Sequence, residues 1–121
     1  MEDVIAAGGL EFFVENRVGE RDGGPSIQVR TTVDGQRVQL LRFDMFRIQP
    51  HYHYAPMGKN LRYDLDPLTV DDGIGWAMAL LGSKLPQLVE KAGHPELATP
   101  ANLDAAVKVL PEVEQRWRAL S

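Results

Sequence analysis

Two histidines separated by one residue are the feature of this sequence best suited to chemistry. His51 and His53 lie in the segment Pro50-His51-Tyr52-His53-Tyr54, which has the character of a β-strand. Residues two apart on a strand point to the same face of a sheet, so both imidazoles would project together.

The segment that follows predicts an acid and a base beside these histidines. Residues 61–65 look like a further strand, and the turn-forming residues 55–60 would join the two strands as a hairpin. In that register Arg62 faces the second histidine and Asp64 faces the first. The four side chains would then form one polar patch.

Two histidines and one aspartate can supply the facial triad of a non-haem iron site or three ligands of a catalytic zinc. The sequence therefore suggests a metal site of His51, His53 and Asp64, holding zinc, iron or manganese. The histidine pair resembles the first half of the cupin motif, in which a glutamate and a later histidine follow. Here no glutamate follows within the next turn and the only later histidine is His94, so the properties of that family are not carried over.

Two other interpretations stay open. In the first, the histidines are partly exposed and structural, and His51 is hydrogen-bonded to Asp64. Arg62 would then pair with Asp44 or Asp66. In the second, a histidine beside a carboxylate acts as a metal-free general base near neutral pH.

The residues that alternate with the histidines would face the other side of the sheet. Tyr52, Tyr54 and Tyr63 lie there together with Leu61. The three tyrosines, with Arg62, could bind a planar ligand, or they could pack against one another across the strands.

The remaining candidates favour structural roles. His94 follows a glycine at a predicted helix end, where an imidazole interacts favourably with the helix dipole. Trp76 and Trp117 fall on predicted helices, and core or interface packing is expected for both.

A hairpin precedes the histidines in the chain. Residues 10–19 and 26–33 are predicted strands, and the second alternates apolar and polar residues. Asp34-Gly35 is a strong signal for a two-residue turn. The register across that turn predicts three opposed pairs: Val33 with Gln36, Thr31 with Val38, and Val29 with Leu40.

The strand after this turn changes its alternation in the middle. Leu41, Phe43 and Met45 share one face, whereas Arg42 and Asp44 take the face that had been apolar. Either a bulge reverses the strand, or both faces of the sheet are covered.

The chain becomes helical after residue 67. Thr69-x-x-Asp72 resembles a capping box that starts a first helix, and Gly82-Ser83 is expected to end it. Ser83 could cap a second helix that closes at Gly93.

A third helix is predicted to start at Thr99-Pro100, where a capping threonine precedes a proline. Pro111 should kink or divide it, because proline lacks the N–H that the helix ladder requires.

Strands over residues 10–66 followed by helices over residues 69–119 predict the α+β class in a single domain, residues 1–121. We expect an antiparallel meander of four or five strands with two or three helices packed on one face. Such a sheet has a second side uncovered, which favours a homodimer.

Composition narrows the function classes. The 121 residues contain no cysteine, which excludes disulfides, thiolate zinc sites, iron–sulfur clusters and cysteine nucleophiles. The net charge is −4, with 13 basic residues scattered among 17 acids, and this argues against nucleic-acid binding. An acidic N-terminal segment without a long apolar run predicts a cytoplasmic protein that does not bind membranes.

These observations lead to two functional hypotheses. The first is a homodimeric interaction or subunit-type protein without a strong catalytic signature. The second is a metal-dependent enzyme or small-ligand-binding protein that uses His51, His53 and Asp64.

Overall fold

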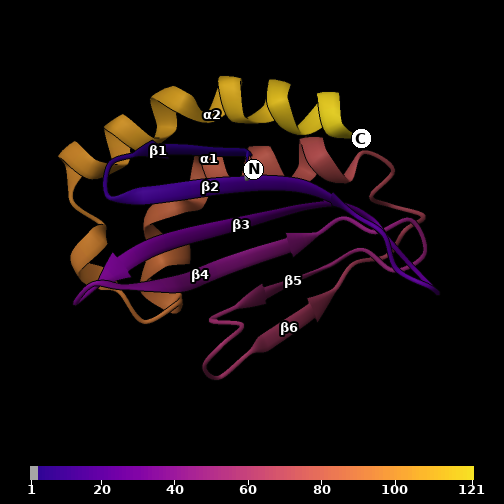
Figure 1. Ribbon diagram of the computed structural model, residues 1–121, viewed down its shortest axis with the longest axis horizontal. Coiled ribbons are helices and arrows are strands. Elements are labelled where there is room, and N and C mark those ends of the chain that lie inside the picture. Colours follow the sequence, from indigo (N-terminus) through magenta and orange to yellow (C-terminus); the bar gives the residue numbers. More distant parts are fainter. Residues whose placement is uncertain (1–2) are drawn as a thin grey trace.

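Six strands form one antiparallel sheet in chain order in the computed structural model, which describes residues 3–121 (Figure 1). The strands are β1 (Asp3–Ala7), β2 (Leu10–Arg17), β3 (Gly24–Val33), β4 (Gln36–Asp44), β5 (His51–Tyr54) and β6 (Leu61–Asp64). Three helical elements follow: α1 (Gly73–Lys91), a short 3₁₀ helix η1 (Pro95–Leu97) and α2 (Pro100–Leu120). The predicted α+β meander is confirmed, with six strands rather than four or five.

The additional strand is β1, which lies before the first strand that the sequence predicted. Its residues, DVIAA, show no alternation of polar and apolar side chains that would indicate a strand. Gly8 and Gly9 connect it to β2 with positive φ angles of 61° and 78°. A Cβ atom on Gly8 would lie 2.0 Å from the backbone oxygen of Asn102, so α2 can approach this turn only over a glycine.

Both long helices lie on the same side of the sheet, and α2 runs along β1 and β2 (Figure 1). This confirms the prediction that the helices cover one face. The buried core between the two layers is apolar and comes from both, including Phe12, Ile27, Val29 and Phe43 from the strands and Leu81, Leu85, Val113 and Trp117 from the helices.

A β-bulge divides the β3–β4 hairpin. The outer part has the predicted register, with Val33 opposite Gln36 and Thr31 opposite Val38. The pairing then shifts, and Val29 lies opposite Leu41 rather than the predicted Leu40.

The bulge explains the change of alternation seen in the sequence. Leu40 and Leu41 are both fully buried in the same core, which a regular strand with alternating side chains could not achieve. The next polar residues, Arg42 and Asp44, consequently lie on the face away from the helices. Of the two explanations considered, the bulge is the correct one.

The start of α1 differs from the predicted capping box. Asp72 itself is the N-cap, and its carboxylate oxygen accepts the backbone N–H of Gly75 at 3.1 Å. Aspartate at this position satisfies an N–H that the helix leaves without an internal partner.

The predicted break at Gly82-Ser83 corresponds to a kink one residue further on, where two helical segments of α1 meet. The backbone leaves helical geometry at Lys84, where φ is −128° and ψ is 16°. Pro86 follows two residues later and cannot donate a hydrogen bond to the preceding turn, which accounts for the distortion. Ser83 donates its hydroxyl to the carbonyl oxygen of Ala79 and does not cap a second helix.

The two predicted helix ends further along are confirmed. Gly93, with φ of 95°, follows Ala92, the C-cap residue of α1. Thr99 caps α2 and accepts the backbone N–H of Asn102, and Pro100 is its first residue. Pro111 lies within α2 but does not divide it, because the helix runs without interruption to Leu120.

Candidate functional site

The helix-free face of the sheet carries the predicted histidines. On one side β5 pairs with β6, and His51 lies opposite Asp64 and His53 opposite Arg62, which is the register that the sequence predicted. On the other side β5 pairs with β4, which places Asp44 opposite His51.

The two imidazoles lie next to each other, as the strand spacing required. Their ring centroids are 5.0 Å apart and their planes are nearly perpendicular. His51 is 6% exposed and His53 is 5% exposed, so the interpretation in which they are partly exposed is wrong.

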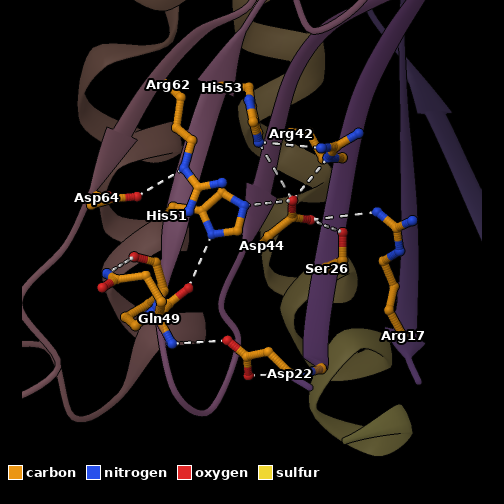
Figure 2. A network of polar contacts seen from close by, with 12 residues as sticks. Arg17, Asp22, Ser26, Arg42, Asp44, Gln49, His51, His53, Arg62 and Asp64 are labelled. Carbon is orange, nitrogen blue, oxygen red and sulfur yellow. Dashed lines mark hydrogen bonds and ion pairs between the residues drawn. The ribbon is translucent and has the colours of Figure 1, made fainter. Parts of the chain in front are cut away.

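A buried carboxylate joins them (Figure 2). Asp44 is 1% exposed; its Oδ1 accepts the hydroxyl of Ser26 at 2.7 Å and its Oδ2 accepts Nε of Arg42 at 2.9 Å. The same Oδ2 lies 3.2 Å from Nε2 of His51 and 3.7 Å from Nε2 of His53. Burial alone would raise the pKa of Asp44, but the hydrogen bonds from His51 and Ser26 and the charge of Arg42 outweigh it and lower the pKa to about 2.

Each histidine is oriented through its other ring nitrogen. Nδ1 of His51 lies 3.0 Å from the carbonyl oxygen of Gln49, and Nδ1 of His53 lies 2.7 Å from Oδ1 of Asn60. Both partners are oxygens that only accept, so Nδ1 donates in each case. Both Nε2 atoms are therefore left to face Asp44.

Arg42 occupies the space between the carboxylate and the second histidine. Its Nη2 lies 3.2 Å from Nε2 of His53, and because arginine only donates, that ring nitrogen accepts. Burial lowers the pKa of His53, and the Arg42 charge lowers it further against the raising effect of the Asn60 hydrogen bond. His53 is thus held as a neutral imidazole, and the lone pair on its Nε2 points towards the guanidinium group of Arg42.

The acid proposed from sequence lies apart from this cluster. Asp64 is 57% exposed in its side chain, and its Oδ1 accepts Nε of Arg62 at 2.8 Å. Among the described residues, the group whose ligand atoms lie within 4.8 Å of one another is Asp44, His51 and His53. The six residues between β4 and β5 form no tight turn, so the sequence had no signal for this register, although it did show the shift in alternation at Asp44.

The tyrosines proposed as ligand-binding residues lie on the opposite face from Arg62. Tyr52 stacks on Phe43 with ring centroids 5.3 Å apart and on Tyr63 with centroids 5.5 Å apart. Tyr54 belongs to the same aromatic group and lies under the Lys91 ammonium group. Their contacts are those of cross-strand packing, and the four proposed residues do not form one surface.

His94 is separate from the cluster as well. Its Nδ1 lies 2.9 Å from Oε2 of Glu96, and the residue precedes η1.

A pocket of about 330 Å³ opens over the histidines. The site residues form part of its wall, and the rest includes Arg17, Arg62, the loop residue Asp22 and Phe46.

Together the fold and the site define an α+β domain with a six-stranded antiparallel meander, helices on one face, and a buried His–His–Asp cluster beside a pocket on the other. The chain belongs to the family described as Domain of unknown function (DUF7700), whose sequence model matches residues 4–117. No curated protein and no solved structure matches the chain. Within residues 3–121, no helix has the length and apolar character needed to cross a membrane.

Proposed function

We propose that this domain binds a divalent transition-metal ion through His51, His53 and Asp44, and that the bound ion serves to hold or transform a small molecule in the adjacent pocket. The observation that carries the proposal is the shared orientation of the two imidazoles. Each is held at Nδ1 by an oxygen acceptor, and each directs Nε2 at the same buried carboxylate oxygen.

The donor set suits the metals that the sequence suggested. Two imidazole nitrogens and one carboxylate oxygen are ligands for zinc, iron or manganese. Three protein ligands leave at least one coordination position for water or a small molecule. A pocket beside the cluster gives such a molecule access.

The surroundings of the histidines also match those of metal ligands. Histidines that bind metals usually donate their second ring N–H to a carbonyl or carboxylate oxygen, which fixes the tautomer and the ring orientation. Gln49 and Asn60 supply such oxygens here.

The contact between His51 and Asp44 adds a further argument. The hydrogen on Nδ1 of His51 is already directed at Gln49, while Nε2 lies 3.2 Å from an ionised carboxylate oxygen. With Nδ1 donating to Gln49, Nε2 donates to this oxygen only when the ring carries a second proton, and a metal ion between the two atoms can take the place of that proton. Arg42 would have to leave Nε2 of His53 to admit the ion.

The experiment is a metal titration of protein purified without a histidine tag. We expect one equivalent of zinc, iron(II) or manganese to bind in calorimetry and to raise the melting temperature. His53→Ala should weaken binding at least about tenfold, because it removes a ligand. His94→Ala is the matched control, since it removes an imidazole that lies outside the cluster, and it should bind as the native protein does.

Circular dichroism separates a lost ligand from a lost fold in the His53→Ala variant. If the native protein retains less than about a tenth of an equivalent of metal and no metal shifts its melting temperature, the metal site does not exist. That result would favour the other hypothesis, an interaction domain without chemistry of its own.

A homodimer also remains a proposal. The sequence favoured it because helices on one face leave the other face of the sheet uncovered. The change of alternation that suggested a second covered face is explained by the bulge at Leu40. Light scattering after size exclusion tests it: twice the mass of one chain at micromolar concentration supports the dimer, and the mass of one chain contradicts it.

A further inference from the structure

Three arginines from three different strands line the pocket over the histidines (Figure 2). Arg17 is the last residue of β2, Arg42 lies in β4 and Arg62 lies in β6. The volume of about 330 Å³ is at the lower end of the range for small-molecule pockets.

The acids of the pocket are already engaged by the protein. Oδ1 of Asp22 accepts the backbone N–H groups of Gly23 and Ile48, and its Oδ2 accepts that of Gln49. Desolvation would raise the pKa of Asp22, but these backbone hydrogen bonds outweigh it and lower the pKa. Asp44 is similarly enclosed by donors, one of which is Nε of Arg42, so neither acid is free to pair with Arg17 or Arg62.

Arg17 and Arg62, in contrast, keep N–H groups that can bind a ligand. The nearest acid to Arg17 is Asp44, at 4.0 Å from Nη1 to Oδ1, which is beyond hydrogen-bonding distance. Within residues 3–121, Arg62 uses Nε for Asp64 and its two Nη groups make no hydrogen bond. Both side chains are about half exposed, at 43% and 48%.

We infer that this pocket binds a small organic anion, whose carboxylate or phosphate group is held by Arg17 and Arg62 beside the metal ligands. The inference deepens the proposed function and rests on it for the role of the metal. Planar guanidinium groups pair with two oxygens of such an anion at once, and these charge-assisted bonds are strong. The small volume favours an anion of metabolite size over a peptide or a nucleic acid.

The test uses two anions and the full chain. Succinate and inorganic phosphate are titrated by calorimetry into metal-free protein, and succinate also into zinc-loaded protein; succinamide, which has the same shape without charge, is the ligand control. We expect an anion to bind, and zinc to strengthen the binding of succinate because it adds positive charge. Tighter binding of succinate indicates a carboxylate ligand, and tighter binding of phosphate indicates a phosphorylated one.

Arg17→Gln and Arg62→Gln should each weaken anion binding about tenfold, the loss expected for one charge-assisted hydrogen bond. Both residues are exposed enough for the fold to tolerate the change. Arg116→Gln is the matched control, because it removes an arginine of similar exposure from α2, and it should leave binding within about twofold.

The two proposals fail in different measurements. If neither anion binds, or if the pocket variants bind as tightly as the control, the anion site is overturned. The metal titration of the native protein is a separate measurement, and its result still decides the metal site. If zinc does not bind but succinate or phosphate does so through Arg17 and Arg62, the metal proposal fails and the anion site survives.

Discussion

Asp44 and Asp64 both face His51 in the sheet, from β4 on one side and from β6 on the other. The carboxylate of Asp44 lies 3.2 Å from the ring and is buried. That of Asp64 is exposed and bound to Arg62. The two aspartates therefore occupy equivalent positions in the strand pairing but very different environments.

Replacing each aspartate by asparagine should separate the two positions. Asp44→Asn removes a buried charge that Arg42, Ser26 and His51 surround, and we expect it to lower the free energy of unfolding by about 2–4 kcal/mol. Asp64→Asn should cost less than about 0.5 kcal/mol, because exposed ion pairs contribute little. Urea denaturation of metal-free protein measures both, and equal costs would contradict the assignment of Asp44 as the acid of the cluster.

Arg42 should compete with a metal ion. Its guanidinium group contacts the ligand atoms of both Asp44 and His53, so a metal must displace it. We expect Arg42→Gln to bind zinc about tenfold or more tightly than the native protein does, since a charge-assisted contact is no longer lost on binding. Arg116→Gln, which removes an arginine of α2 that lies outside the site, serves as the control. Weaker zinc binding by Arg42→Gln would show that the arginine supports the metal site instead.

The bulge in β4 can be tested by stability alone. Leu40→Ala and Leu41→Ala should each cost about 2–5 kcal/mol, because both side chains are fully buried. Gln36→Ala, at an exposed position of the same strand, should be close to neutral. A regular strand would place one of the two leucines on the helix-free surface, so a small cost for either one would argue against the bulge.

Asp72 links the two helices and should make part of the stability depend on pH. It caps α1 and accepts Nη2 of Arg118 from α2 at 2.9 Å. The hydrogen bond from Arg118, followed by that from Gly75, lowers the pKa of Asp72 below its ordinary value of 3.8. A depressed pKa means that this contribution is present above pH 3.8 and is lost as the pH falls through the pKa of the folded state.

Asp72→Ala should accordingly lower the free energy of unfolding by about 1 kcal/mol at pH 7. The difference from the native protein should shrink as the pH is lowered below 3.8, where the native carboxylate becomes protonated too. Asp71→Ala leaves the cap in place and is the control. A constant difference from pH 7 to pH 2 would mean that the charge of Asp72 contributes nothing.

Local features of the site could be derived from residue order. The spacing of His51 and His53 on an extended segment placed both rings on one face, and the short turn to β6 determined which residues face them. Turns and helix caps such as Asp34-Gly35, Gly93 and Thr99 could also be predicted from the sequence, because the backbone preferences that form them involve only a few neighbouring residues.

The acid of the cluster was decided only by tertiary structure. Leu40 and Leu41 are both buried in the core beneath the helices. The β-bulge at Leu40 adds one residue to β4, and Asp44 therefore lies on the face of the sheet away from the helices. The connection from β4 to β5 is too long to set a register by itself, so the pairing of Asp44 with His51 depends on how the whole sheet packs against α1 and α2. The alternation of side chains along a strand depends only on local backbone geometry. Which apolar residues are buried depends on the packing of the complete core.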